Sequence, residues 1–413
     1  MSVTEFFTFP RIRRRMYAGP LGPHVDEFTE RLQQQGYSKR SIRNKIRAVA
    51  NFSRWLVIHD LRAQDVDAAR RKRFLAHRKR AGGWTSEDAA ALREIQALLC
   101  EQGVTHVPDT SEDLSPRERM ELDFRVFLSQ DRGLAPVTVQ NYLRVVSCLL
   151  KECFVDDSAR TELLTSTDVI GFVQRHAHSH GHSWAQSMVT ALRAFLRYLH
   201  RHGKIPADLG ACVPAVAGWS FSRLPAFLST EETQRVLDTC NRRTAMGRRD
   251  YAMLLLCARL GLRAGEVAAL CLDEIDWASG CFSIRSKGGR WTQMPLLHEV
   301  GEAITEYLTD GRPSCRDRHV FIREHAPYTG FGSSSSVSAV ASRALARAGI
   351  VSPRKGAHLF RHTLATQMLG QGASLAEIGQ LLRHQHPDTT RIYAKVDLPA
   401  LRKLAPPWPG GAR

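Results

Sequence analysis

Two breaks marked by proline and glycine interrupt the helical periodicity of this chain, and they constrain its fold more than any other feature. On both sides of each break, apolar residues recur at spacings of three and four, as on the buried face of an α-helix. The first break runs from Val107-Pro108 to Ser115-Pro116, and the second from Ile205-Pro206 to Leu224-Pro225. Because 413 residues are too many for one compact core, the pattern predicts three mainly α-helical domains.

The breaks predict where the domains lie. We expect an N-terminal helical bundle in residues 1–110, a second helical bundle in 111–205, a linker in 206–225, a third domain in 226–400 and a C-terminal tail in 401–413. The two bundles resemble each other at a spacing near 100 residues, since Gly36-Tyr37-Ser38 corresponds to Gly133-Leu134-Ala135, and Gly103 to Gly203. Each glycine could end a helix as its C′ residue. We interpret the first bundle as a possible duplicate of the second.

The third domain differs in character from the bundles. It begins with a capping box, Ser229-Thr230-Glu231-Glu232, and a later helix is expected to end at Gly261. Alternating residues on both sides of Lys287-Gly288-Gly289 predict a β-hairpin within residues 281–296. Helices are expected at 337–348, 359–369, 375–382 and 389–395. The domain should be mixed α+β with a small antiparallel sheet.

The charge of the chain limits its function. Lys and Arg number 58 against 41 for Asp and Glu, which gives a net charge of +17 and indicates a polyanionic partner. No run approaches the roughly 18 apolar residues that a membrane span needs. The arginines of residues 11–15 are not followed by an apolar segment, so the N-terminus does not read as a secretory signal. We expect a cytoplasmic, nucleoid-associated protein.

The metal-ligating residue types do not form a recognisable site. The nine cysteines are scattered and never form C-x-x-C, a pattern typical of reduced, packed thiols. His176, His178, His180 and His182 alternate, but no cysteine or carboxylate joins them in the sequence. We interpret them as a polar loop that faces DNA, and we expect neither a metal nor a cofactor.

Several polar residues stand within otherwise apolar helical sequence of the third domain. Glu266 lies three residues after Arg263, so both can share a helix face, and His358 and Arg361 have the same spacing. Lys287 lies at the predicted hairpin turn. The remaining two are His384, at the end of Leu381-Leu382-Arg383-His384, and Tyr393, nine residues later. Taken singly, each could be an ordinary structural residue, for example a surface ion pair or a half-buried tyrosine.

In this order and spacing, these residues resemble the tyrosine recombinase family, the phage integrases and Xer-type DNA strand-transfer enzymes. The matching residues are Arg263, Lys287, His358, Arg361, His384 and Tyr393. The resemblance covers about residues 115–400 and implies a helical, SAM-like core-binding bundle before a catalytic domain. It does not extend cleanly to the first 110 residues, where phage integrases often carry a small β-rich domain. Either extra contacts with DNA or contacts with another protomer are the expected roles of that bundle.

The chemistry of phosphodiester cleavage accounts for these residue types. Two guanidiniums, of Arg263 and Arg361, can hold the negative charge that develops on the non-bridging oxygens. By resemblance, Tyr393 is the nucleophile, His358 the base and Lys287 the acid for the departing 5′ oxygen. Glu266 would orient Arg263 or His358. His384 would hydrogen-bond the phosphate. Because a phosphotyrosine conserves the bond energy of the phosphodiester, rejoining of the strands needs no ATP.

The sequence therefore predicts a site-specific DNA recombinase that forms a covalent phosphotyrosine intermediate, for integration, excision or transposition of a mobile element. A type IB topoisomerase and a DNA-binding module without strand exchange are the alternatives. Double-stranded DNA is the expected partner, with a homotetramer in the synaptic complex and a possible accessory protein or second recombinase. Candidate DNA contacts are Arg40, Arg43, Arg71, Arg73, Arg78, Arg80, Thr138, Asn141, Arg144 and Arg290.

Overall fold

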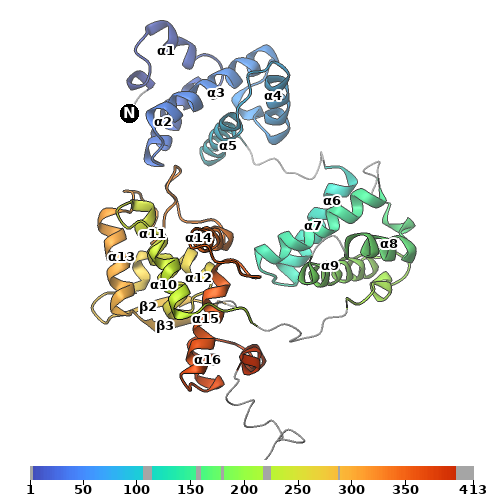
Figure 1. Ribbon diagram of the computed structural model, residues 1–413. Helices are drawn as coiled ribbons and strands as arrows, with labels where there is room; N and C mark the ends of the chain where they lie inside the picture. The colour runs from blue at the N-terminus through green and yellow to red at the C-terminus, as the bar shows by residue number, and fades with distance from the viewer. Residues whose placement is uncertain are drawn as a thin grey trace, which may run out of the picture. The chain divides into compact units, whose positions relative to one another are not determined.

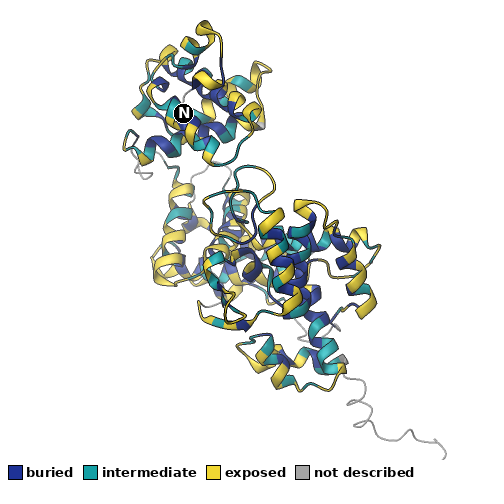
Figure 2. Ribbon diagram, turned by 90° about the vertical axis from the view of Figure 1, so that its left-hand side faces the viewer, coloured by how far each residue is buried: buried dark blue, intermediate teal, exposed yellow. Residues whose placement is uncertain are grey.

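A computed structural model describes residues 3–105, 114–154, 160–177, 181–216, 225–286 and 289–396. The chain divides into two compact units. The first comprises Met1–Thr105 and Arg223–Arg413, and the second His106–Ser222 (Figure 1). Most of the buried residues are apolar, and Figure 2 marks the buried positions in dark blue along the ribbon.

The N-terminal part of the first unit is a helical bundle with a core of its own. Phe28, Phe52 and Leu92 are fully buried in it. Helix α5 begins with a capping box in which Thr85 and Asp88 bond each other's backbone N–H groups. The elements are η1 (Val3–Glu5), α1 (Pro10–Met16), η2 (Gly22–His24), α2 (Val25–Gln34), α3 (Lys39–Ile58), η3 (Ala63–Asp65), α4 (Ala68–Arg80) and α5 (Ser86–Glu101).

The second unit is also a helical bundle. Phe124, Phe172 and Phe195 lie in its core, where the rings of Phe124 and Phe195 meet edge to face at 5.0 Å. The elements are α6 (Pro116–Val126), the π-helical η4 (Phe127–Asp131), α7 (Pro136–Cys153), η5 (Thr161–Leu163), α8 (Ser166–Ala177), α9 (His182–Arg201) and η6 (Leu209–Cys212).

The two bundles end in the same local geometry. After α5, Gly103 has φ +68° and the N–H of Val104 bonds the carbonyl of Leu99; after α9, Gly203 has φ +66° and Lys204 bonds Leu199. Both are Schellman ends, in which glycine avoids the penalty that other residues pay at positive φ. This shared motif fits the predicted duplication, which stays a prediction.

The C-terminal part of the first unit is built around helix α11 (Ala245–Leu260), whose residues Leu254 to Cys257 are fully buried. α11 packs against α13 (His298–Asp310) and α15 (Ala357–Gly370) (Figure 1). The predicted capping box begins α10, and the predicted glycine ends α11 with φ +59°. The other helical elements are α10 (Thr230–Asp238), α12 (Ala264–Ala269), η7 (Leu272–Glu274), α14 (Ser334–Arg347), α16 (Leu375–Leu381), η8 (Pro387–Thr389) and η9 (Arg391–Val396).

A three-stranded antiparallel sheet covers one side of this core. It consists of β1 (Ile275–Asp276), β2 (Cys281–Arg285) and β3 (Trp291–Pro295) in that order. Strands β2 and β3 form the predicted hairpin, with Phe282 opposite Met294 and both facing the core. The predicted fold class, mainly α with a small antiparallel sheet, is confirmed.

Candidate active site

Arg263 and Glu266 lie where α11 gives way to α12. Gly261 turns the chain out of α11, and Arg263 becomes the N-cap residue of α12. The backbone N–H of Arg263 donates to Glu266 Oε2 at 2.9 Å, and its Nη1 donates to Oε1 at 2.7 Å. Glu266 is 6% exposed, whereas the side chain of Arg263 is 30% exposed. These contacts hold Arg263 against Glu266 and leave part of the guanidinium open, while the orienting role of Glu266 stays a prediction.

Arg361 approaches the same turn from α15. It is 2% exposed, and its guanidinium donates to the carbonyl of Gly261 at 2.5 Å and to the carbonyl of Leu382. Burial, the charge of Arg263 and the charge of Arg383 lower the pKa of Arg361 to about 10. The guanidinium still carries its charge at neutral pH, so two arginines far apart in sequence direct positive charge to one place.

The histidines lie around these arginines. His384 Nδ1 lies 2.7 Å from Thr390 Oγ1, and desolvation and the charges of Arg361 and Arg263 lower its pKa to about 4. His358 is exposed, but desolvation by surrounding atoms and the charge of Arg361 lower its pKa too. Both rings are therefore neutral at pH 7. A neutral imidazole can accept a proton, which fits the role predicted for His358.

Tyr393 packs in a small apolar cluster with Ala365 of α15 and with Ile378 and Leu382. It is 2% exposed, and its hydroxyl lies 3.0 Å from Nδ1 of His362. Burial raises its pKa to about 12, although the charges of Arg361 and Arg354 act in the opposite direction. The segment that carries it is the 3₁₀-helix η9, in place of the α-helix expected at 389–395. The tyrosine hydroxyl is therefore buried and bonded to His362 in this structure.

The structure brings together five of the six predicted catalytic residues, by shared contacts or by electrostatic interaction: Arg263, His358, Arg361, His384 and Tyr393. Lys287 lies outside the described residues, although the hairpin that flanks it is present. A cavity of about 130 Å³ is lined by Arg263, Ser286, Arg383, His384 and Thr389, among others. Its lining joins the turn after α11, the hairpin and the segment after α16.

Sequence reasoning missed two residues of this site. His362 directly follows Arg361, and it holds the tyrosine hydroxyl. Arg383 directly precedes His384, and its Nη2 donates to Glu266 Oε2 at 2.9 Å. The only signal in the sequence was a polar side chain next to a residue already singled out.

The predicted DNA contacts are spread over the surface. On α7, Asn141 and Arg144 are exposed and Thr138 is half-buried, and all three fall on one stretch of the helix. Exposed arginines also occur on α3, on α4 and beside the hairpin: Arg40, Arg43, Arg73, Arg80 and Arg290. Two others are already engaged or partly covered, since Arg78 pairs with Asp88 at 3.2 Å and Arg71 is half-buried.

The histidine run does have possible co-ligands, contrary to the sequence argument. His176 Nε2 lies 2.8 Å from Glu152, and its ligand atoms and those of Glu152 and Cys148 lie within 4.8 Å of one another. They were missed because Cys148 and Glu152 come from α7 and meet His176 only in the fold. The carboxylate already accepts a charge-assisted hydrogen bond from Arg175 and contacts the His176 ring, so this cluster alone gives no case for a metal. His178 and His180 lie outside the described residues.

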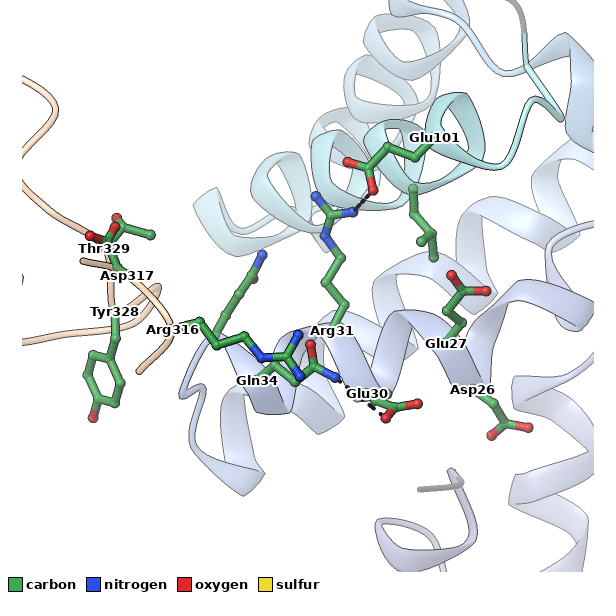
Figure 3. A pocket seen from close by; sticks show the side chains of 12 residues that line it. Asp26, Glu27, Glu30, Arg31, Gln34, Glu101, Arg316, Asp317, Tyr328 and Thr329 are labelled. Atoms are coloured by element: carbon green, nitrogen blue, oxygen red, sulfur yellow. Dashed lines mark hydrogen bonds and ion pairs between the residues drawn. The ribbon is translucent and has the colours of Figure 1, made fainter. Parts of the chain in front are cut away.

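A wide cavity in the first unit, of about 1240 Å³, lies apart from the candidate active site (Figure 3). Its lining carries five carboxylates and two arginines, one of which, Arg31, is bonded to Glu101 at 2.6 Å. The carboxylates are Asp26, Glu27, Glu30, Glu101 and Asp317. Such a lining repels a phosphate backbone, so the cavity is not a candidate for the DNA site.

Comparisons with known proteins agree with this site. The model of the "Phage integrase family" matches residues 226–398. "Putative integrase/recombinase y4rA" of Sinorhizobium fredii is 41% identical over 399 residues, which cover 96% of each chain. Tyrosine recombinase XerD of Listeria innocua is 28% identical over 286 residues, or 66% of this chain and 93% of its own length.

Two solved structures share the fold. The XerH site-specific recombinase bound to palindromic difH substrate has a TM-score of 0.54 at 17% identity, and covers 70% of this chain and 84% of that chain. A lambda integrase dimer bound to a COC' core site has a TM-score of 0.51 at 17% identity, and covers 75% and 88%. The chain belongs to the phage integrase family of tyrosine recombinases. It is a site-specific recombinase that acts on DNA, as the sequence predicted.

Across the described ranges, from residue 3 to residue 396 with their gaps, no helix combines the length and the apolar character that a membrane span requires.

Proposed function

We propose that this recombinase cleaves DNA by attack of the Tyr393 hydroxyl on a phosphodiester held by Arg263, Arg361 and His384. The observation that supports this most is the convergence of these groups, since Arg361 bonds the Gly261 carbonyl two residues before Arg263 and lies within electrostatic range of both Arg263 and Tyr393. The Tyr393 oxygen bonds to phosphorus, and the 5′ oxygen of the next nucleotide leaves with a proton. Lys287 would donate that proton, and His358 would accept the proton of the tyrosine.

Sequestration of Tyr393 adds a step before chemistry. A buried phenol with a pKa near 12 is a poor nucleophile, so DNA binding has to release the hydroxyl from His362 and present it to the phosphate. The cationic field of the arginines would then favour the phenolate. Cleavage is in this way restricted to protein that is bound at a site.

The proposed reaction also predicts which segments hold the DNA and how many protomers assemble on it. Residues 111–205 and 226–400 would hold the duplex, with the exposed side of α7 at the DNA backbone. Strand exchange between two duplexes needs more than one protomer, and lambda integrase has been solved as a tetramer bound to a Holliday junction. We expect a tetramer on two sites in the cytoplasm, acting in integration, excision or transposition of a mobile element, with or without a second recombinase. Residues 1–110 would add DNA or protomer contacts.

Covalent trapping tests the proposal. Purified full-length protein is incubated with a library of nicked duplexes, denatured in detergent, and the DNA that stays linked to protein is sequenced. Wild-type protein should form adducts on a small set of sequences, whereas Tyr393→Phe should form none. Tyr307→Phe is the matched control, because Tyr307 is a buried tyrosine of the same domain and lies outside the site.

The other outcomes are decisive. Adducts that persist in Tyr393→Phe would overturn the choice of nucleophile. Adducts on all sequences alike would favour the topoisomerase alternative, and DNA binding without any adduct would favour a module that lacks strand exchange.

A further inference from the structure

Arg383 occupies a backbone conformation that suits glycine better. It follows α16 and has φ +55°, and within the described ranges Asp60 is the other residue besides glycine with positive φ. A left-handed conformation is unfavourable for a residue that has a Cβ. A large side chain is retained here in spite of that cost.

The side chain of Arg383 carries a second local cost. It is 6% exposed, and its Nε is buried without a hydrogen-bond partner among the described residues. Its Nη1 donates to the Leu381 carbonyl at 3.0 Å and contacts the sulfur of Met294 at 3.1 Å, while its Nη2 donates to Glu266. A buried arginine with an unpaired donor in a strained backbone is more often explained by function than by stability.

The electrostatic role of Arg383 is visible at Glu266. One oxygen of this buried carboxylate accepts from Nη1 of Arg263, and the other accepts from the Arg263 backbone and from Arg383. One negative charge thus lies between two guanidiniums, and the trio keeps a net positive charge. With Arg383 removed, Glu266 would neutralise Arg263 alone, and the buried setting would make that loss large.

The two arginines of this trio, together with His384, line the cavity of about 130 Å³. We propose that Arg383 is a positioning residue of the cleavage site. It shares the negative charge of Glu266 with Arg263, so that the net charge of these three groups stays positive beside the scissile phosphate. This inference rests on the proposed function, because it assumes that Arg263 holds that phosphate. Arg383 acts on Arg263 through their shared partner Glu266.

The test uses glycine, which the backbone of residue 383 accepts. In Arg383→Gly the relief of strain offsets part of the lost ion pair, so the full-length protein should fold. Single-turnover cleavage is measured on the nicked duplex that the wild-type protein attacks in the trapping experiment. We expect a loss of roughly 10- to 100-fold, the size of one charge-assisted interaction at the phosphate, while Arg383→Lys should lose less.

Two further measurements separate a positioning role from a structural one. In the Arg383→Gly/Glu266→Gln double variant the carboxylate charge that neutralises Arg263 is gone, so cleavage should recover most of the loss. On a duplex with an uncharged methylphosphonate at the cleaved position, wild-type and Arg383→Gly proteins should differ much less. Asp60→Gly controls for backbone relief, and Arg318→Gln, in an exposed pair with Asp273, controls for one lost charge.

The results that overturn the inference are distinct from those that overturn the function. Wild-type cleavage rates in Arg383→Gly would refute it, and so would a loss that Glu266→Gln leaves unchanged and that is equal on both substrates. If the wild-type protein forms no adduct that depends on Tyr393, the proposed function fails, and the inference fails with it.

Discussion

Mild acid should destabilise the C-terminal part of the first unit, because it contains a histidine that is buried in its neutral form. His362 is 6% exposed, and desolvation together with the charges of His358 and Arg354 lowers its pKa to about 4. In the unfolded chain its pKa is near 6.5. Between pH 6.5 and about 4 the unfolded chain therefore binds more protons than the folded one. The stabilisation is complete above pH 6.5 and is lost as the pH falls through this window.

The magnitude follows from the two pKa values. At pH 5 the unfolded histidine is protonated and the folded one is almost entirely neutral. The free energy of unfolding falls by roughly 1.4 kcal/mol for each pH unit below 6.5, so at pH 5 the loss is about 2 kcal/mol. That is a large share of the 5–15 kcal/mol that typically stabilises a domain. His384 acts in the same direction, with a smaller contribution because solvent reaches it. Glu266 does not oppose the trend, because despite its burial the Arg263 N–H and the charge of Arg383 lower its pKa.

The assay is urea unfolding of the full-length protein at pH 7, 6 and 5, followed by hydrogen exchange of peptides from α15. His362→Asn can still bond the Tyr393 hydroxyl but does not titrate, so the free energy of unfolding of this variant should depend less on pH. His298→Asn, which replaces a histidine on the surface of the same part of the chain, should keep the wild-type dependence. Equal slopes for wild type and His362→Asn between pH 6.5 and 5 would refute the reasoning.

Three other perturbations test the geometry. Gly261→Ala should destabilise the first unit by about 1–3 kcal/mol in urea unfolding, since φ is +59° and a Cβ would lie 2.6 Å from a methyl carbon of Leu382; an unchanged unfolding midpoint would contradict the turn described here. Phe124→Ala should cost the second unit about 3–5 kcal/mol and leave hydrogen exchange of α11 unchanged, because the two cores are separate. Acetylimidazole should leave Tyr393 unmodified in the folded protein and modify it once urea has unfolded the chain, as read by mass spectrometry; rapid modification of the folded protein would contradict the buried hydroxyl.

Local signals in the sequence predicted much of the fold. The capping box at Ser229 and Glu232, the glycine that ends α11 and the Lys-Gly-Gly hairpin each depend on a few neighbouring residues, so their chemistry is readable without tertiary structure. The order and spacing of the candidate catalytic residues were readable for another reason, since they match a known family. The segment around Tyr393 was less predictable, because its apolar spacing does not distinguish an α-helix from the observed 3₁₀-helix.

Long-range contacts were beyond sequence reasoning. The ion pair of Arg383 with Glu266 joins residues 117 apart, and the contact of His362 with Tyr393 joins residues 31 apart. Nothing in the local pattern indicates that a polar residue in apolar helical sequence faces a partner from another segment. For the same reason, Glu152 and Cys148 were not associated with His176.

In the proposed mechanism, the nucleophile Tyr393 starts from a buried position within electrostatic range of the arginines. At pH 7.5 a phenol with a pKa near 12 is ionised in only about one molecule in 30,000, and burial also keeps it from the phosphate. Movement of Tyr393 out of its apolar cluster and toward the arginines would both lower the pKa of the phenol and bring its oxygen to the phosphate. There desolvation no longer raises the pKa, and Arg361 and Arg354 already act to lower it. The binding free energy of the correct DNA site is the available source for that movement, so specificity for the site and activation of the nucleophile would be one event.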